Sequence, residues 1–258
     1  MPEYLKLVKQ GNTAVVTFNN PPAHTWTKES LTDLKHLVIE LNEDRSIYAL
    51  ILTGGGDKFF SAGADLNVFA SGDKSVAKEM SDIFGEAFET LSAFRGVSIA
   101  AINGYAMGGG LEVALACDVR IAESHAQMAL PEATVGLLPC AGGTQNLHIL
   151  VGEGWTKRMI LCGERIKADK ALQIGLVEEV VESGQGLSAA IALADKVAKQ
   201  SPVAVTACKN LVQMSRSMPI SNALPIERQA FVDLFDSEDQ TEGVNAFLEK
   251  RKPQWKNK

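Results

Sequence analysis

Two glutamates in apolar, glycine-rich surroundings are the residues of this chain best suited to chemistry. Glu112 follows three consecutive glycines, residues 108–110, and stands near the start of a stretch that looks helical as far as Cys117. Glu132 stands in Leu-Pro-Glu, just ahead of a second glycine- and proline-rich stretch, residues 135–145. Apolar surroundings raise the pKa of a carboxyl group, which suits proton transfer near neutral pH. Two such groups suit proton transfer to and from carbon atoms beside an activated carbonyl group.

The glycine triplet adds a binding site for developing negative charge. Glycine lets the backbone approach a ligand closely, and the first N–H groups of a helix have no partner within it. The helix dipole adds to this effect, so a carbonyl oxygen that becomes an anion is stabilised there without a charged side chain. Gly108 and Glu112 are about one helical turn apart, so this carboxylate faces the same point as the amides. Taken alone, Glu112 is more typical of a solvated or favourable charge at a helix N-terminus than of a catalytic group.

Composition and charge restrict the classes of protein to which the chain can belong. Its 258 residues are enough for one large domain with a sizeable core. Hydrophobic residues make up 46% and charged residues 22%, as in ordinary globular proteins. No apolar run reaches the length of about eighteen residues that a membrane-spanning helix needs. The formal net charge of −6 argues against general nucleic-acid binding, which requires a basic surface.

Cysteine and histidine usage argues against a metal site. The cysteines stand at positions 117, 140, 162 and 208 and the histidines at 24, 36, 125 and 148. Neither set has the spacing of a zinc site or of a disulfide framework. We therefore expect free thiols in a reducing compartment, a cytoplasmic location and no bound metal.

Strands and helices are predicted to alternate through the first part of the chain. Hydrophobic patterns predict strands over residues 13–18, 48–53, 97–102 and 176–181 and helices over residues 28–42, 76–91, 111–117 and 154–161. Thr27 is a candidate cap for the first helix, and Gly175 fits the C-terminus of a further helical stretch that starts at Ile166. The almost wholly apolar run 48–53 predicts a central strand. Such alternation is typical of an α/β fold.

The chain changes character beyond Ser183. Helical patterns cover residues 189–198, 202–214, 219–235 and 240–251, with no convincing strand among them. We therefore divide the chain into a core region, residues 1–182, and a helical C-terminal region, residues 183–258. The apolar faces of these helices exceed what a small core would bury, which predicts oligomerisation.

Several motifs together resemble those of the enoyl-CoA hydratase family, the crotonases. They are Ala-Ile-Asn-Gly-Tyr-Ala-Met-Gly-Gly-Gly-Leu-Glu (101–112), Cys-Asp (117–118), Leu-Pro-Glu (130–132), Gly-Gly-Thr-Gln (142–145), Phe-Ser-Ala-Gly-Ala-Asp (60–65) and Glu-Lys-Arg-Lys-Pro (249–253). Because they extend over most of the chain, a chance match to one glycine-rich motif is excluded. The resemblance implies a crotonase-like α/β spiral of repeated β-β-α units, which the sequence itself hides. It also implies a helical C-terminal trimerisation region, commonly used to build a dimer of trimers.

The resemblance assigns roles to four residues of the candidate site. It places the oxyanion hole for the thioester oxygen on the backbone N–H groups of Ala64 and Gly109. The catalytic acid and base are Glu112 and Glu132, which hold a water molecule between them. Glu132 then exchanges a proton with the α-carbon, and Glu112 helps to activate the water.

The resemblance also implies how an acyl-CoA is held. Backbone contacts come from Ala23, Ala62 and Ala64, while Phe247 and Lys250 lie near the adenine end, supplied by a neighbouring subunit. The basic cluster of residues 250–252 is a candidate for phosphate contacts, although a charge run near a terminus is as often plain solvated surface. Coenzyme A is part of the substrate here, so no separate cofactor is expected.

Three positions depart from the family pattern. Cys140 follows Pro139 where the family commonly has glycine, Asn146 follows Gln145 where it has arginine, and His24 replaces an asparagine. Cys140 stands in a loop expected beside the acyl pocket, and His24 in one expected near the CoA arm. Candidates for shaping the acyl pocket are Trp26, Phe69, Met80, Phe84 and Leu138.

The activity implied is the reversible addition of water to a trans-2-enoyl-CoA, which gives a 3-hydroxyacyl-CoA. An enoyl-CoA isomerase on the same fold is the first alternative, since moving a proton between carbons needs only one carboxylate. A non-catalytic, RNA-binding member of the family is an alternative of another class. The acidic net charge and the two glutamates count against it.

Overall fold

Two mostly parallel sheets form the centre of the computed structural model, which describes residues 4–258 and leaves the first three residues of the predicted core region outside. The larger sheet has the order β1-β2-β3-β5-β7-β10 and the smaller one the order β4-β6-β8-β9. The strands of the larger sheet are β1 (Leu5–Gln10), β2 (Thr13–Phe18), β3 (Ala49–Gly54), β5 (Val97–Ile102), β7 (Val119–Glu123) and β10 (Glu179–Val181). Those of the smaller sheet are β4 (Phe59–Ser61), β6 (Tyr105–Met107), β8 (Gln127–Ala129) and β9 (Ile166–Lys167).

The helices cover these sheets and continue beyond them. The α-helices are α1 (Lys28–Glu43), α2 (Lys74–Ser92), α3 (Gly109–Ala116), α4 (Gly143–Leu161), α5 (Ala168–Gln173), α6 (Gly186–Val197), α7 (Pro202–Met214), α8 (Ile220–Asp233) and α9 (Glu238–Leu248). Three short 3₁₀ segments are η1 (Leu66–Phe69), η2 (Glu132–Val135) and η3 (Leu234–Asp236). Thr27 caps α1 as predicted, because its side chain accepts a hydrogen bond from the N–H of Ser30.

The chain builds the two sheets by repeating one β-β-α unit. Three times in succession, a strand of the larger sheet leads to a strand of the smaller sheet and then to a helix: β3-β4-α2, β5-β6-α3 and β7-β8-α4. Successive units add parallel strands to both sheets. The α/β fold and the spiral of β-β-α units are thus confirmed. The sequence hides the repeat because β4, β6 and β8 have only three residues each, too few for a periodic signal.

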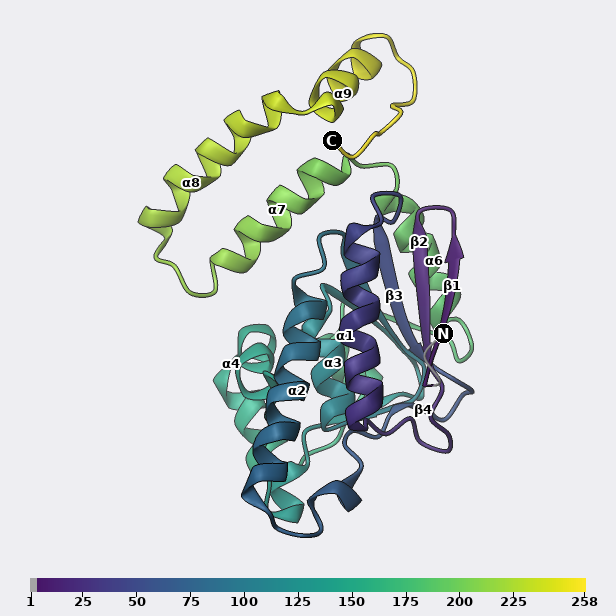
Figure 1. Ribbon diagram of the computed structural model, residues 1–258, viewed down its shortest axis with the longest axis vertical. Coiled ribbons are helices and arrows are strands. Elements are labelled where there is room, and N and C mark those ends of the chain that lie inside the picture. Colours follow the sequence, from purple (N-terminus) through teal and green to yellow (C-terminus); the bar gives the residue numbers. More distant parts are fainter. Residues whose placement is uncertain (1–3) are drawn as a thin grey trace.

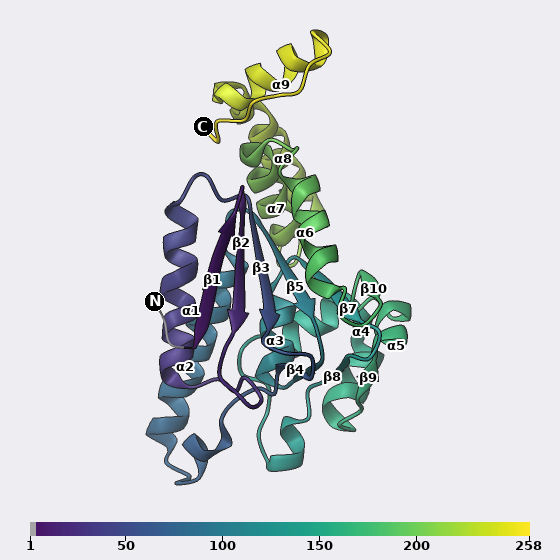
Figure 2. The ribbon, with the colours of Figure 1, turned by 90° about the vertical axis from the view of Figure 1, so that its right-hand side faces the viewer.

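Helices cover both faces of the larger sheet, which explains its apolar strands (Figure 2). The main core cluster joins one face to α1, α2 and α3, and a second cluster joins the other face to Ala190 and Ala194 of α6. Every residue of β3 is buried, as its apolar run predicts for a central strand.

Helix α3 lies inside the molecule and carries the first glutamate. All eight of its residues are buried, and Glu112 is the one charged residue in Gly-Gly-Leu-Glu-Val-Ala-Leu-Ala. A helix that is apolar all round belongs in a core. The N-terminus of α3, which carries the glycines, is therefore held in a fixed position by the surrounding core.

The last three helices form an arm that extends from the core (Figures 1 and 2). Helix α7 is attached through Lys209, whose Nζ donates to the carbonyl of Phe94 (2.6 Å) and to Asp118 Oδ2 (2.7 Å). Many apolar side chains of the arm remain exposed, among them Ile220, Phe231, Phe235, Phe247 and Leu248. The first helix of the predicted C-terminal region, α6, still packs against the sheet, and the division at residue 182 stays a prediction.

The elements that were predicted differ from their observed counterparts mainly at their ends. The predicted strand 176–181 contributes only Glu179–Val181 to the ladder, because the N–H groups of Leu176 and Val177 donate to the carbonyl of Ala171 in α5 instead. The predicted helix 154–161 is the second part of α4, which continues on both sides of a kink at Gly152 (φ 74°). Helix α9 ends at Leu248, short of the predicted Arg251. None of the helices within residues 4–258 combines the length and hydrophobicity required to cross a membrane.

Candidate active site

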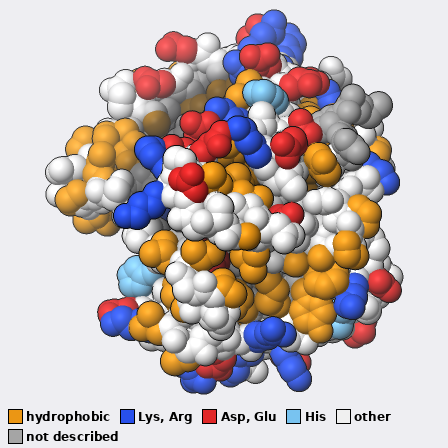
Figure 3. Space-filling model, turned by 60° about the horizontal axis from the view of Figure 1, so that its bottom comes forward, with side chains coloured by type: hydrophobic (Ala, Val, Ile, Leu, Met, Phe, Trp, Pro, Cys, Tyr) orange, Lys and Arg blue, Asp and Glu red, His pale blue; other side chains and the backbone are white. Residues whose placement is uncertain are grey.

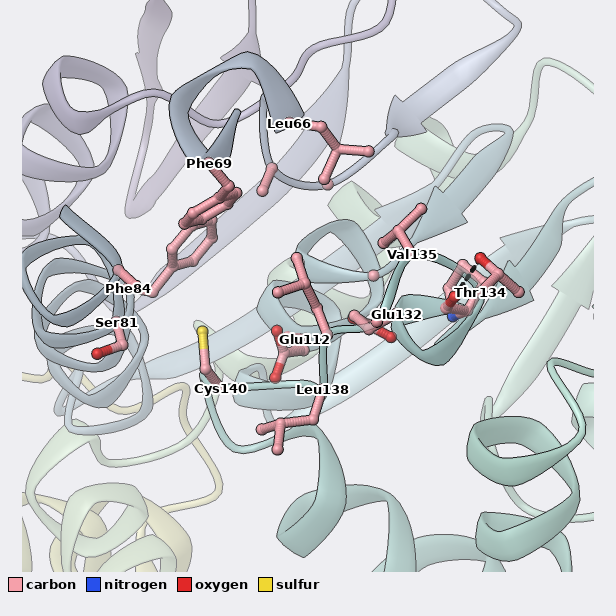
Figure 4. A pocket seen from close by; sticks show the side chains of 18 of the residues that line it. Leu66, Phe69, Ser81, Phe84, Glu112, Glu132, Thr134, Val135, Leu138 and Cys140 are labelled. Atoms are coloured by element: carbon pink, nitrogen blue, oxygen red, sulfur yellow. Dashed lines mark hydrogen bonds between the residues drawn. The ribbon is translucent and has the colours of Figure 1, made fainter. Parts of the chain in front are cut away.

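A cavity of about 720 Å³ brings both glutamates together with the two predicted amide donors. Its walls come from the loop 62–64, η1, the N-terminal half of α2, the start of α3, and the segment from Pro131 to Cys140. Figure 4 shows the carboxyl groups of Glu112 and Glu132 next to one another in this cavity. Residues from four separate stretches of the sequence therefore meet at one point.

Glu112 is held in place by the loop that leads into α4. Its Oε1 accepts hydrogen bonds from the backbone N–H groups of Ala141 (2.8 Å) and Gly143 (2.9 Å). The side chain is buried, and a β-carbon at position 143 would lie 2.9 Å from this oxygen. Glycine at 143 is therefore needed for the backbone to come close enough to hold the carboxylate.

Glu132 lies in a different environment. It begins η2, directly after Pro131, and both of its carboxyl oxygens are buried without a hydrogen-bond partner among the described residues. A β-carbon at Gly108, whose φ is 53°, would lie 3.0 Å from Glu132 Oε1. The glycine triplet therefore also makes room for the second carboxyl group.

The pKa values of the two carboxyl groups differ because their environments differ. Burial raises the pKa of Glu132 to about 7, and the negative charge of Glu112 adds to this effect. Burial also raises the pKa of Glu112, but its two N–H partners act in the opposite direction by stabilising the anion. At neutral pH the pair can therefore hold one proton, with Glu132 as its natural carrier.

The predicted oxyanion-hole amides lie beside the carboxyl groups. A β-carbon at Gly63 would be 3.1 Å from the backbone nitrogen of Gly109, so the loop 62–64 and the start of α3 are in close contact. Within the described chain, no backbone carbonyl accepts a hydrogen bond from the N–H of Ala64 or Gly109. Both residues line the cavity. Two free amides at this point can bind an oxygen that gains negative charge.

Apolar side chains dominate the outer wall of the cavity. Leu66, Val135, Leu137 and Leu138 line it and are exposed. Figure 3 brings the bottom of the molecule forward and shows hydrophobic side chains gathered over that face. An exposed apolar surface that continues into a pocket is typical of a site for an apolar ligand.

The predicted pocket-shaping residues are only partly right. Phe69, Phe84 and Leu138 line the cavity, whereas Trp26 and Met80 are buried in the core behind it. Six further residues line the cavity that were not predicted to do so: Leu66, Lys78, Ser81, Thr134, Val135 and Leu137. No local signal marks them, because only the fold brings η1, α2 and the segment around η2 together around one cavity.

Cys140, where the chain departs from the family pattern, lines the same cavity. Figure 4 places its sulfur between Glu112 and the α2 residues Ser81 and Phe84. Burial and the charges of the two glutamates raise the pKa of this thiol to about 11. It is therefore a neutral group of the pocket wall at physiological pH.

The predicted CoA contacts fall into two groups. Ala62 and Ala64 line the cavity, and the carbonyl of Ala23 accepts a hydrogen bond from the N–H of Ala62 (2.9 Å). Phe247 and Lys250 are not among the lining residues. They lie at the end of α9, in the arm at the top of Figure 1. Within one chain, the structure does not bring them to the site.

Comparison with known proteins places this geometry in a family. The model of the family described as enoyl-CoA hydratase/isomerase matches residues 8–258. A short-chain-enoyl-CoA hydratase of Clostridium acetobutylicum is 39% identical, with 95% of each chain covered. A 2,3-dehydroadipyl-CoA hydratase of Escherichia coli is 41% identical, with 97% of each chain covered. The structure of DspI from Pseudomonas aeruginosa is 64% identical and superposes with a TM-score of 0.96, covering 98% of this chain and 97% of the other.

The chain therefore belongs to the enoyl-CoA hydratase/isomerase family. It is an enzyme of the enoyl-CoA hydratase kind, and the resemblance predicted from the sequence motifs is confirmed.

Proposed function

We propose that this enzyme adds water reversibly to a trans-2-enoyl-CoA and releases a 3-hydroxyacyl-CoA. The observation that carries the proposal is the pair of buried carboxyl groups, one held by two amides and the other unpartnered within the described chain, beside two free backbone N–H groups. Hydratases among the relatives support this direction of the chemistry.

The environments of the two glutamates support separate roles. Glu112, whose carboxyl oxygen accepts hydrogen bonds from two N–H groups, positions the water and takes up its proton as the oxygen attacks the β-carbon. Glu132, with a pKa of about 7, carries the proton that is delivered to the α-carbon. In the dehydration direction the same two transfers run backwards. Neither transfer requires a metal or a redox cofactor, so we propose that coenzyme A takes part only as the carrier of the substrate.

The free N–H groups of Ala64 and Gly109 bind the thioester oxygen. When a nucleophile attacks the β-carbon, negative charge moves through the conjugated system to this oxygen. Preformed donors that face it stabilise the enolate, and removing one such donor typically costs a factor of about 10² to 10³ in rate. We assign the CoA contacts of the same chain to the backbone of Ala23, Ala62 and Ala64.

We further propose that the enzyme works as a homotrimer or a dimer of trimers in the cytoplasm. The exposed apolar side chains of the arm support an oligomer, and the cysteines are all free, which supports a reducing compartment. Phe247 and Lys250 would then meet the adenine end of a CoA bound to a neighbouring subunit. Sedimentation equilibrium should give a mass near three or six times 27.7 kDa, and a monomer would rule out this part of the proposal.

Enoyl-CoA isomerase activity is the second candidate, because Glu132 alone could move a proton between the α- and γ-carbons. The firm attachment of Glu112 favours hydration, since isomerisation does not need a second, fixed base. The deciding experiment offers the purified protein crotonyl-CoA and longer 2-enoyl-CoAs and follows the absorbance of the conjugated thioester. Hydration lowers this absorbance and yields a 3-hydroxyacyl-CoA. If no chain length gives a loss of absorbance, the protein is not a hydratase.

A further inference from the structure

His24 lies outside the cavity, yet its imidazole is buried and has a partner on each side. Nδ1 lies 3.2 Å from the backbone nitrogen of Asn20, and Nε2 lies 2.7 Å from the carbonyl oxygen of Gly55. The first partner is a donor and the second an acceptor, so we assign the neutral tautomer with its hydrogen on Nε2. The backbone of His24 has a φ of 52°, a left-handed conformation that is uncommon for residues with a β-carbon. Both side-chain bonds help to hold it there.

The turn to which His24 is attached is itself fixed. Asn103, which directly follows β5, accepts a hydrogen bond from the N–H of Gly54 (3.0 Å) and donates to the carbonyls of Gly54 (2.9 Å) and Gly56 (2.8 Å). The turn between β3 and β4 is thus tied to the neighbouring repeat unit. His24 connects the loop that follows β2 to this fixed turn.

The backbone of His24 connects in turn to the loop of the oxyanion hole. Its carbonyl accepts a hydrogen bond from Ser61 Oγ (2.7 Å), and the same Oγ accepts one from the N–H of Gly63 (3.2 Å). Ser61 is fully buried. The serine hydroxyl therefore links the backbone of His24 to that of Gly63, the residue directly before Ala64.

Backbone pairing then fixes the direction of the Ala64 N–H group. Trp26 and Ala64 form a parallel β-bridge, in which the N–H of Trp26 donates to Gly63 (2.8 Å) and its carbonyl accepts from Asp65 (3.0 Å). In such a parallel bridge one of the two paired residues, here Trp26, makes both hydrogen bonds. The other residue, here Ala64, directs its N–H away from the paired segment. Ala64 consequently presents its N–H to the cavity for as long as the segment from His24 to Trp26 keeps its place.

We propose that His24 is a positioning residue for the oxyanion hole, acting through Ser61 and the bridge between Trp26 and Ala64. The proposal rests on the function proposed above, in which the Ala64 N–H binds the thioester oxygen. Without the imidazole bonds, the loop relaxes and the Ala64 N–H turns away from the position at which the oxygen becomes negative. Displacing this donor weakens the stabilisation of the transition state more than that of the bound substrate. We therefore expect kcat to fall by a larger factor than KM rises.

Three variants test the proposal. His24→Phe keeps a ring of similar size and removes both bonds, and we expect its kcat for crotonyl-CoA to fall at least tenfold. His24→Asn tolerates the left-handed backbone and places an oxygen near the position of Nδ1, but it does not reach Gly55. Its kcat should therefore lie between that of His24→Phe and that of the native enzyme. Ser61→Ala breaks the connection one step further on, and it keeps the proposal testable if His24→Phe does not fold.

The matched control removes a buried serine hydroxyl elsewhere. Ser98 is also fully buried, and its Oγ donates to Asp118 Oδ2 (2.9 Å) at the start of β5. Ser98→Ala should lose stability as Ser61→Ala does but keep the native kcat. In the double variant of His24→Phe with Ser61→Ala, the two losses in log kcat should not add, because both act along one connection.

A spectroscopic measurement separates positioning from a general loss of structure. A cinnamoyl-CoA with an electron-donating ring substituent absorbs at longer wavelength when its carbonyl accepts stronger hydrogen bonds. Bound to the native enzyme it should show a red shift, which His24→Phe and Ser61→Ala reduce and Ser98→Ala leaves unchanged. Equal shifts and equal kcat values in native enzyme and variants would overturn the role of His24 while leaving the hydratase intact. A native enzyme that hydrates no enoyl-CoA would instead overturn the proposed function, and this role with it.

Discussion

Two walls of the cavity each carry a glutamate carboxyl group, but the two groups have opposite hydrogen-bonding environments. One wall, formed by α3 and the loop 140–143, surrounds Glu112 with amides that donate to its carboxylate. The other wall, formed by the segment from Pro131 into η2, leaves both oxygens of Glu132 buried and unpartnered within the described chain. The difference supports the proposal that the two glutamates have separate roles, set by their backbone surroundings and not by residue type.

We expect this difference to determine which of the two carboxyl groups holds a shared proton. Amides that donate to a carboxylate stabilise its anion, whereas burial without partners favours the neutral acid. In the proposed mechanism, the proton is therefore on Glu132 and the charge on Glu112 before hydration. After hydration the two states are exchanged. One proton on the pair is required in both directions, so the pair has to be considered as one coupled acid.

The largest expected effect comes from Glu132→Gln. The change keeps the shape of the side chain but removes the group that we propose to exchange a proton with the α-carbon. Hydration of crotonyl-CoA and exchange of the α-protons of butyryl-CoA in D2O should both fall by a factor of about 10² or more, the usual scale of a general acid–base group. Absorbance and proton NMR measure the two rates. Native-like hydration by this variant would remove Glu132 from the mechanism.

Glu112→Gln tests whether the two glutamates have separate roles. Its carboxylate is assigned to the water, so hydration should again fall by a factor of about 10². Exchange of the α-protons, which needs no water at the β-carbon, should fall by less than about tenfold. If both rates fall equally, the two glutamates do not have separate roles. Native-like hydration would return Glu112 to its simpler interpretation as a charge at a helix N-terminus.

The pH dependence of the reaction should follow the raised pKa of Glu132. Above about pH 7 the pair loses its one proton, and kcat/KM should fall about tenfold per pH unit. The midpoint should be the same for hydration and dehydration, because the net reaction neither releases nor takes up a proton. Initial rates with crotonyl-CoA and with 3-hydroxybutyryl-CoA, measured between about pH 5.5 and about pH 9, check both points. A flat profile over this whole range would show that no group with a pKa near 7 controls the rate.

Much of the fold could be predicted because its signals are local. The apolar run at residues 48–53, the cap at Thr27 and the amphipathic pattern of α2 each specify one element without help from the rest of the chain. The three-residue strands β4, β6 and β8 give no such signal. Their order in the smaller sheet repeats that of β3, β5 and β7 in the larger sheet, because each of them follows one of these strands in the chain.

The candidate site shows the same limit. The glycines around Glu112 predict free amides, but the partners of its carboxylate lie 29 and 31 residues further on, at Ala141 and Gly143. Trp26 and Met80 were predicted to shape the pocket by size and hydrophobicity, and the same properties place them in the core. Composition cannot distinguish a buried side chain from one at the wall of a cavity, because this depends on which elements pack against it.

The smallest expected effect is on the stability of the folded protein. It tests the environment of Glu132 in the absence of any substrate. The pKa of Glu132 is raised in the folded protein, from an ordinary 4.5 to about 7. Folding is therefore favoured when the group is protonated, and this contribution is lost as the pH rises from about 4.5 through about 7. Glu132→Gln cannot ionise, so it should be more stable than the native protein at about pH 8 but not at about pH 4. Allowing for solvent near the cavity mouth, the gain should be on the order of 1 kcal/mol, or about 2 °C in Tm. Thermal unfolding at the two pH values checks this, with Glu112→Gln as the matched control. That variant should gain less at the higher pH, because the neutral amide oxygen of glutamine accepts weaker hydrogen bonds from Ala141 and Gly143 than the carboxylate does. An equal gain for both variants would mean that the amides do not distinguish the two walls.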